Sequence, residues 1–531
     1  MRFRVWGRVC ISNTLHYIAR RSIAYPPMKP NKPARPTAAP SMERQNDLQR
    51  ISNLAQSGKW AEAIAATERW LKPGTRDAEF MRVRAVLEDR AQRFGMAVRW
   101  AIAAEALASH PDTMVILGRA AANAGRTDEA LAHYRRILDV EPGHPGTRLL
   151  MAQALEAAVR TTEASEVLEA LRRDITGKDP ALFRQVQHLT AAVMVHQKQL
   201  GEAVELLDKD VLRPGAPDDL VRTALYLRAK ACDRLGRYDE AFESAAKANA
   251  IGDPQFDPLL YREGVQALMD HWTRATMANF PSSRSDSALP VFIAGMPRSG
   301  TSLLDQVVDA HAQAAGVGEM AVIEHFARQL EGVWDASQPA PESFGPMRDR
   351  AFKNAAAAYI AECQKEAPGA RRVVNKALGN NRIVGLLARL FPKTRVIHAI
   401  RDPRDVAVSC FMGGFNNDYY PWTAKPEWIA VAWDESRRLM EHWKRETDLP
   451  ILDVRYEDVV TNPGEEFPRF IDFLGLEWDE GCNRFHERKR TVRTLSYDQV
   501  NRPLYATSVN RWQHYEKFLK GVAWPAYEID G

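Results

Sequence analysis

The chain has 531 residues, of which 45% are hydrophobic and 26% charged, so it is typical of soluble globular protein and long enough for two or three domains. Its formal net charge of +4 arises from the first 42 residues, which hold eight basic side chains and no acid and leave 64 basic against 68 acidic residues elsewhere. This balance argues against a nucleic-acid partner, and no apolar run reaches the ~18 residues that span a bilayer.

Five of the six arginines in residues 1–42 lie among apolar residues near the start, and a proline-rich stretch follows them. An arginine-rich segment without acids is also typical of a targeting peptide. We expect a disordered or mis-assigned N-terminal extension instead, because helical periodicity begins only after Met42.

The N-terminal half contains a repeated pattern in which glycine, acidic residues and alanine precede a helical stretch. Six marker alanines lie 34, 33, 34, 39 and 38 residues apart: Ala63, Ala97, Ala130, Ala164, Ala203 and Ala241. This resembles the tetratricopeptide repeat, a helix–turn–helix unit of about 34 residues. Gly118, Ala130, Tyr134 and Pro142 fit the family pattern in the best copy.

The resemblance implies an all-α solenoid over residues 47–261, whose concave surface binds peptides or partner proteins in such families. An alanine-rich helical bundle is the alternative. Residues 282–290, rich in serine and aspartate, are expected to form the linker to a second domain over residues 291–525.

That second domain opens with the apolar run VFIAG at 291–295, followed by MPRSGTS and a helical pattern. Strand, glycine-containing loop and helix form an arrangement that binds phosphate through backbone N–H groups. Gly295 and Gly300 are spaced as in a P-loop, but Thr301 stands where that loop has lysine. A P-loop kinase or NTPase needs that lysine and a magnesium-binding acid, and it remains an alternative; Arg298 supplies the positive charge here.

Further strand-like runs alternate with helical patterns: RRVVNK at 371–376, TRVIHAI at 394–400 and ILDVRYEDVV at 451–460. Such alternation predicts an α/β domain with a mostly parallel sheet and helices on both faces. Ligands of these sheets bind at the carboxyl ends of the strands.

The segments PRSGTS, RDPRDVAVS and RYEDVVTNP resemble the sulfotransferase superfamily, whose donor is 3′-phosphoadenosine-5′-phosphosulfate (PAPS). The resemblance implies that Arg401 and Ser409 bind the 3′-phosphate, and the planar fork of arginine suits a phosphate dianion. It also implies a loop that binds the 5′-phosphosulfate, made of Pro297, Arg298, Ser299, Gly300, Thr301 and Ser302. No metal is expected.

Three further segments are DAHAQAAGVGEM at 309–320, NKALGNN at 375–381 and LSYDQVNRPLYATSVNRW at 495–512. They resemble segments of the tyrosylprotein sulfotransferases and their bacterial relatives fused to tetratricopeptide repeats, and the resemblance covers about residues 291–519. The resemblance implies that Glu319 is the catalytic base and that Lys376 and Ser496 stabilise the transition state. It places further cofactor contacts on Tyr456 and Arg511.

The sequence therefore predicts sulfuryl transfer from PAPS to a hydroxyl acceptor, with protein tyrosine as the first candidate. Alternatives are a hydroxyl of a small molecule, lipid or glycan, and a repeat scaffold with an inactive transferase domain. The repeats are expected to help bind a protein or peptide acceptor, and the aromatic loop Gly413–Trp422 is a candidate acceptor site. Five cysteines without a Cys-x-x-Cys pair favour a reducing, cytoplasmic compartment over a disulfide framework or zinc site.

Overall fold

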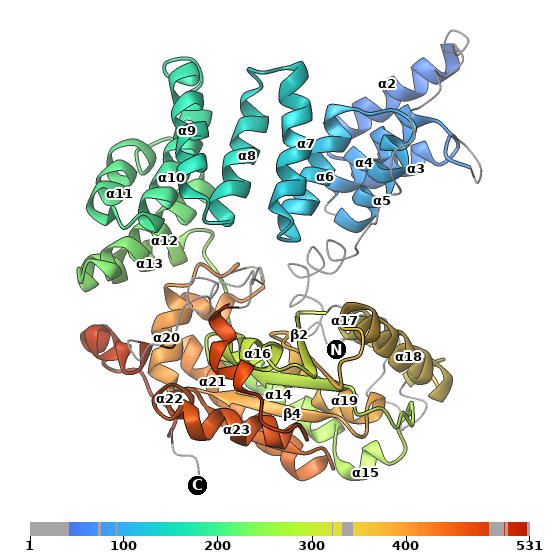
Figure 1. Ribbon diagram of the computed structural model, residues 1–531, viewed down its shortest axis with the longest axis vertical. Coiled ribbons are helices and arrows are strands. Elements are labelled where there is room, and N and C mark those ends of the chain that lie inside the picture. Colours follow the sequence, from blue (N-terminus) through green and yellow to red (C-terminus); the bar gives the residue numbers. More distant parts are fainter. Residues whose placement is uncertain are drawn as a thin grey trace. The chain divides into compact units, whose positions relative to one another are not determined.

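The computed structural model describes residues 42–72, 76–91, 93–320, 322–331, 344–417, 419–487, 504 and 508–527 (Figure 1). Its described residues form two compact units, of which one ends at Lys198 and the other begins at Gln199.

The first unit consists of consecutive helices that pack as pairs. They are α2 (Met42–Gln56), α3 (Trp60–Thr67), α4 (Ala78–Arg90), α5 (Phe94–Glu105), α6 (Pro111–Asn123), α7 (Thr127–Val140), α8 (Pro145–Ala157), α9 (Thr161–Ile175) and α10 (Pro180–His196). Three of them begin at a proline, directly after a capping side chain of His110, His144 or Asp179 that accepts a backbone N–H. Proline at the first helical position and a side-chain cap before it explain why these helices start where they do.

The marker alanines of the repeat pattern lie in the buried interior between packed helices. All six are completely buried, with 0% exposure, including Ala203 and Ala241 in the second unit. In the best copy, a Cβ atom added to Gly118 would lie 2.5 Å from the ring of Tyr134. Small residues at these positions therefore fit the space that the packed helices leave.

The second unit begins with further helices before its sheet. These are α11 (Leu200–Leu206), the π-helix η1 (Leu207–Val211), α12 (Asp218–Arg234), α13 (Tyr238–Ala250), α14 (Pro258–His271) and α15 (Arg274–Met277). Helices α12 and α13 form an antiparallel pair, so the repeat pattern continues into the unit that holds the sheet.

The predicted parallel sheet is confirmed. Its strands are β1 (Pro290–Gly295), β2 (Ala314–Gly318), β3 (Arg372–Asn375), β4 (Arg395–Ile400) and β5 (Ile451–Arg455). They run in the order β2-β3-β1-β4-β5, and every pairing is parallel. The carboxyl ends of all five strands therefore meet at one edge, where such sheets bind ligands.

Helices cover both faces of this sheet, as expected for a central strand that is buried throughout. Val291 and Ile293 share a core with residues of α16 and α23. The ring of Phe292, on the opposite face, stacks on Tyr359 and Phe391 at 5.7 and 6.0 Å between ring centroids.

The remaining helices of the unit belong to these two layers and to the sheet's carboxyl edge. They are α16 (Thr301–Asp309), α17 (Val322–Glu331), α18 (Asp349–Glu366), α19 (Val384–Leu390), α20 (Pro403–Phe411), α21 (Pro426–Glu446), α22 (Tyr456–Thr461), α23 (Pro463–Phe473) and α25 (Glu516–Leu519). Short 3₁₀ helices are η3 (Asn380–Arg382), η4 (Pro421–Ala424), η5 (Glu480–Glu487) and η7 (Arg511–Tyr515).

Residues 282–290, expected as a linker, are extended before β1 and are fixed at their start. The hydroxyls of Ser282 and Ser283 donate to the carbonyls of Arg389 and Leu390 at the end of α19. Both serines are buried, at 8% and 5% exposure. Among the described helices, none has the length and apolar character needed to cross a membrane.

Candidate functional site

Four of the predicted site residues directly follow a strand, and the predicted phosphosulfate loop lies after the remaining strand, so all of them gather at the carboxyl edge of the sheet. Glu319 follows β2, Lys376 follows β3, Arg401 follows β4 and Tyr456 follows β5, and the predicted phosphosulfate loop follows β1. Because the sheet is parallel throughout, residues up to 159 positions apart in sequence, from Pro297 to Tyr456, come to the same edge.

The loop between β1 and α16 has a backbone that few residues tolerate. Gly295 has φ +149°, and a Cβ atom there would lie 2.5 Å from the carbonyl oxygen of Ala399. Arg298 has φ +70° and Gly300 has φ +96°, so two residues of the loop are in the left-handed region. The loop leads into α16 at Thr301, and the N–H groups of a first helical turn have no acceptor within the helix. This geometry suits an anion.

The two predicted phosphate-binding segments touch each other. Nε of Arg298 donates to Oγ of Ser409 at 2.8 Å, and Arg401 donates to the carbonyl oxygen of Arg298 at 3.0 Å. Ser409 and Arg401 are buried, at 7% and 6% exposure. The structure therefore brings the loop after β1 and the start of α20 into one cluster with two guanidinium groups.

Tyr456 contacts both of these segments. The guanidinium of Arg401 lies 4.5 Å from the centroid of the Tyr456 ring, a cation–π geometry. On the loop side, a Cβ atom at Gly300 would lie 2.7 Å from the same ring, which is why glycine is required there.

The nitrogen Nε of Arg401 is buried and has no hydrogen-bond partner among the described residues. A buried donor without a partner costs about 1–3 kcal/mol, which a phosphate oxygen would offset. The cluster of Arg298, Arg401 and Ser409 therefore fits the phosphate groups of PAPS. Within the described part of the chain, no three His, Cys, Asp or Glu side chains are grouped to hold a metal ion.

Asp405, one turn into α20, links Arg401 to the C-terminal part of the chain. Its carboxylate lies 3.6 Å from the Arg401 guanidinium and accepts the backbone N–H groups of Asn510 and Trp512, both at 2.9 Å. Burial raises the pKa of Asp405, against the opposing effect of Arg401 and these hydrogen bonds. Arg401 itself also donates to the carbonyl oxygen of Ser508. Residues 508–512 are thus fixed beside the cluster.

The predicted base and the predicted transition-state lysine form an ion pair. Nζ of Lys376 lies 3.0 Å from Oε1 of Glu319, with side-chain exposures of 4% and 12%. The strand ends of β2 and β3 are neighbours in the sheet, and this adjacency explains why the two side chains meet. Nζ has three protons, so the pair leaves donors for a third group.

The structure places Arg511 in an ion pair with Asp233 of α12, at 2.7 Å. Its predicted contact with the cofactor stays a prediction. Ser496, the second predicted transition-state residue, lies outside the described residues.

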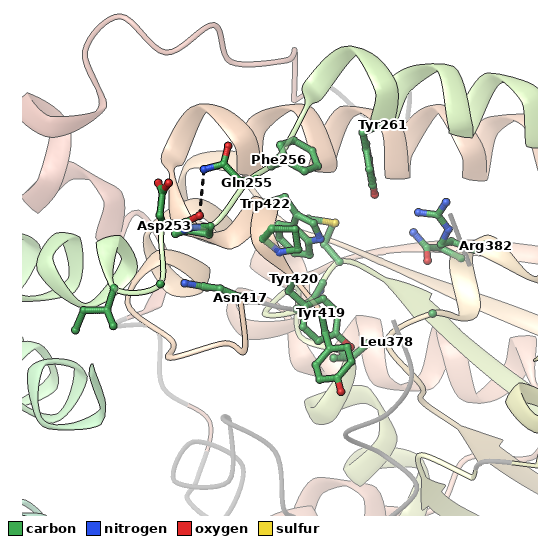
Figure 2. A pocket seen from close by; sticks show the side chains of 18 of the residues that line it. Asp253, Gln255, Phe256, Tyr261, Leu378, Arg382, Asn417, Tyr419, Tyr420 and Trp422 are labelled. Atoms are coloured by element: carbon green, nitrogen blue, oxygen red, sulfur yellow. Dashed lines mark hydrogen bonds between the residues drawn. The ribbon is translucent and has the colours of Figure 1, made fainter. Parts of the chain in front are cut away.

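A cavity of about 390 Å³ adjoins the loop after β1 (Figure 2). Gly295, Met296 and Pro297 of that loop line one side, and the aromatic residues of the loop predicted as an acceptor site line another. Figure 2 shows Phe256 and Tyr261, which come from the segment after α13 and from α14, on a further wall. Glu319 and Lys376 do not line this cavity.

Two polar groups of the cavity wall are buried without partners. Nε and Nη2 of Arg382 have no hydrogen-bond partner among the described residues, and neither has Oδ1 of Asn417. The Arg382 guanidinium lies 5.6 Å from the centroid of the Tyr261 ring. An aromatic wall beside this guanidinium, with its two donors that have no acceptor in the described part of the chain, suits a ligand with a ring and a negative charge.

Some residues of this site were not predicted from the sequence. Asp405 lies inside RDPRDVAVS, but its partners are 105 and 107 residues away. Asp233 and Phe256 both lie in the predicted repeat region, where no local pattern marks a role in the site.

Two family models match the chain. Residues 290–480 match the sulfotransferase family, and residues 121–184 match the tetratricopeptide repeat. The C-terminal part of this chain is a sulfotransferase-family domain. It follows a helical region that contains tetratricopeptide repeats.

Curated relatives share this sulfotransferase-family domain at low identity. An uncharacterized protein of Aquifex aeolicus is 26% identical over 422 residues, 78% of this chain and 54% of its own length. A putative protein-tyrosine sulfotransferase of Caenorhabditis briggsae is 27% identical over 37% of this chain and 69% of its own length. Protein-tyrosine sulfotransferase A of Caenorhabditis elegans is 25% identical over 42% and 60%, respectively. The chain thus spans about half to two thirds of these relatives' lengths.

Among solved structures, the chain is similar to a sulfotransferase domain of the olefin synthase of Synechococcus PCC 7002. The TM-score is 0.34 at 20% identity, over 46% of this chain and 92% of that chain. A sulfotransferase domain from the curacin biosynthetic pathway gives a TM-score of 0.32 at 17% identity, over 45% and 93%.

Proposed function

We propose that the protein transfers a sulfuryl group from PAPS to a hydroxyl acceptor, with protein tyrosine as the acceptor and Glu319 as the base. The observation that carries the proposal is the buried pair of Glu319 and Lys376, which lies at the same sheet edge as the anion-binding loop. A carboxylate, an ammonium group and a phosphate-binding loop are what sulfuryl transfer to a hydroxyl requires.

The donor is assigned from the cluster around Arg401. In this proposal Arg298 and the N-terminus of α16 hold the 5′-phosphosulfate, and Arg401 with Ser409 holds the 3′-phosphate; the bond from Arg298 to Ser409 supports a shared site. The Nε of Arg401, which is buried and has no partner in the described part of the chain, supports a further acceptor atom at this point.

In the proposed reaction, the acceptor oxygen attacks sulfur while the bond from sulfur to the bridging oxygen of the 5′-phosphate breaks. Glu319 accepts the hydroxyl proton, and adenosine 3′,5′-bisphosphate leaves. Negative charge that grows on the bridging and sulfuryl oxygens is stabilised by Lys376, whose ammonium keeps donors free beyond its bond to Glu319. Positioning and electrostatics supply the catalysis, as in phosphoryl transfer.

Protein tyrosine as the acceptor is supported by two observations. The nematode relatives are named protein-tyrosine sulfotransferases. The aromatic cavity beside the loop offers a surface for residues that flank the reacting side chain. Tetratricopeptide repeats commonly bind peptides, so we assign the repeat region to recognition of a protein acceptor or partner.

The test is a turnover assay with radiolabelled PAPS and a panel of tyrosine peptides, simple phenols, lipids and glycans. We expect label transfer to tyrosine peptides, with activity retained in the presence of a magnesium chelator. Transfer only to a non-protein hydroxyl would overturn the assignment of tyrosine as the acceptor. If no acceptor received the label, the proposed sulfotransferase activity would be overturned. A strict magnesium requirement with ATP turnover would instead favour a kinase.

A further inference from the structure

We propose that Asp233, in the last helix pair of the repeat region, is a positioning residue for the donor site. It holds the C-terminal segment, defined as residues 508–519, in the place where that segment supports Arg401. The inference rests on the proposed function, because the donor is PAPS only if that proposal holds. In this inference the repeat region supports nucleotide binding indirectly. It holds the C-terminal segment and does not contact the nucleotide itself.

Asp233 is bonded to the segment twice. Oδ1 of its carboxylate lies 2.7 Å from Nη2 of Arg511. The same oxygen accepts a hydrogen bond from the hydroxyl of Tyr515, at 2.5 Å. Tyr515 is fully buried at 0% exposure, and burial together with the Asp233 carboxylate raises the pKa of its phenol, so the hydroxyl stays protonated and donates. The side chains of Asp233 and Arg511 are 17% and 24% exposed, which shields the pair from solvent.

Helix α13 completes the contact. The rings of Tyr238 and His514 stack at 4.3 Å between centroids, and those of Phe242 and Phe518 stack at 4.1 Å. Phe242 also stacks on Phe411 at the end of α20, at 4.7 Å. The helix pair α12–α13 is thus packed against both the C-terminal segment and the helix that carries Ser409.

The other end of the segment is bonded to the predicted 3′-phosphate site. The carbonyl oxygen of Ser508 accepts from Arg401, and the N–H groups of Asn510 and Trp512 bond to Asp405. The segment therefore connects Asp233 to the guanidinium of Arg401 through a few residues. If Asp233 lost its charge, Arg511 would lose its ion pair, and the bonds that Arg511 and Tyr515 donate would no longer be charge-assisted, so the supports of Arg401 would loosen.

The experiment measures the affinity of the whole chain for two nucleotides by calorimetry. Adenosine 3′,5′-bisphosphate has the 3′-phosphate, and adenosine 5′-phosphate lacks it. We compare Asp233→Asn with the conservative Asp233→Glu and with a control, Asp239→Asn. Asp239 lies on α13 and pairs with Lys517 of the same segment, but the pair is 62% and 58% exposed and should matter little.

We expect Asp233→Asn to weaken binding of the bisphosphate about tenfold, the cost of a lost charge-assisted contact, and to leave the monophosphate within twofold. Asp233→Glu should recover most of the loss, and Asp239→Asn should match the wild-type protein. A purely structural role would weaken both nucleotides alike, and this outcome, like unchanged binding of both, would overturn the inference.

Should Asp233→Asn fail to fold, Tyr515→Phe decides the question, because it removes one hydroxyl and leaves the Arg511 pair intact. We expect it to weaken bisphosphate binding alone, by about threefold, which is within the usual cost of one lost hydrogen bond. Equal affinities of Tyr515→Phe and wild type would overturn the inference. Wild-type protein that binds neither nucleotide would instead reject the proposed donor, so the two failures are distinguishable.

Discussion

Nζ of Lys376 lies 3.0 Å from Oε1 of Glu319, across 57 residues of sequence and between two adjacent strand ends. The base of the proposed reaction is therefore held by the group that stabilises its transition state. Removing either side chain changes the surroundings of the other, so single variants need an acceptor series to separate the two roles.

We predict that Glu319→Gln lowers kcat by ~10²–10⁴, the usual contribution of a general base, and leaves affinity for the donor nearly unchanged. The defect should shrink with more acidic phenols, because these need less help in losing the proton. Turnover measured over phenols of graded pKa checks this. Lys376→Ala is the comparison, since its defect should persist with acidic phenols. Wild-type turnover of Glu319→Gln on every acceptor would remove Glu319 as the base.

Arg401→Ala should reduce the preference for PAPS over adenosine 5′-phosphosulfate, which lacks the 3′-phosphate. The buried guanidinium is placed for a charge-assisted contact, typically about 1.5–3 kcal/mol, so the preference should fall by ~10–100-fold. Competition binding of both nucleotides measures it. Arg469→Ala is the matched control, because that arginine is 40% exposed and pairs with Glu466 within α23. An unchanged preference in Arg401→Ala would contradict the assignment.

Arg382→Met should raise KM for acceptors that carry a carboxylate near the hydroxyl and leave KM for an uncharged phenol unchanged. Two of its guanidinium nitrogens, Nε and Nη2, are buried without a partner among the described residues, Arg382 lines the cavity of Figure 2, and methionine keeps much of the side chain's bulk. A loss of about 1.5–3 kcal/mol corresponds to a rise in KM of roughly 10–100-fold. Steady-state kinetics on a charged and an amidated version of one peptide would decide; equal changes for both would argue against this role.

Gly118→Ala should destabilise the repeat region by about 1–3 kcal/mol, the usual cost of overpacking, because the new methyl group would lie 2.5 Å from the Tyr134 ring. Gly201→Ala in α11 is the control: nothing lies within 4 Å of its added Cβ atom, so helix propensity should keep or raise stability. Thermal unfolding followed by circular dichroism compares them. Equal transition temperatures for the two variants would be inconsistent with the packing described.

Cys410 should resist alkylation in the native protein. Burial raises the pKa of its thiol to about 12, and its Sγ donates to the carbonyl oxygen of Pro297. Since the thiolate is the reactive form, labelling at pH 8 should be very slow and should rise as pH increases toward that pKa. Mass spectrometry of the Cys410 peptide, with denatured protein as the positive control, tests this. Rapid labelling of the native protein at pH 8 would show that Cys410, beneath the loop after β1, is accessible to the reagent.

The sequence contained enough information for the repeat contacts and for the strand ends. A small residue is needed at each marker position because two helices meet there. The regular spacing of alanines such as Ala130 and Ala164 is therefore enough to predict the repeated helix pairs. Likewise, a residue that follows a parallel strand, such as Glu319 or Lys376, must lie at the ligand edge once the sheet is recognised.

The supports of the site could not be predicted in the same way. Tyr515 and Asp233 are 282 residues apart, and each belongs to an ordinary helical pattern. Their contact depends on how α12 and α13 pack against α20 and the C-terminal segment. Packing of this kind depends on the shapes of several elements at once, and no local spacing records it.

Arg298 has a left-handed backbone, at φ +70°, which lowers the stability of the loop after β1, while its side chain belongs to the proposed donor site. A non-glycine residue in this region costs about 1–2 kcal/mol, so glycine would suit the main chain better than the arginine present. Yet glycine would remove the guanidinium that reaches Ser409. Selection for thermal tolerance alone would therefore drive this position away from arginine, and engineered variants with higher melting temperatures should be checked here first for lost turnover.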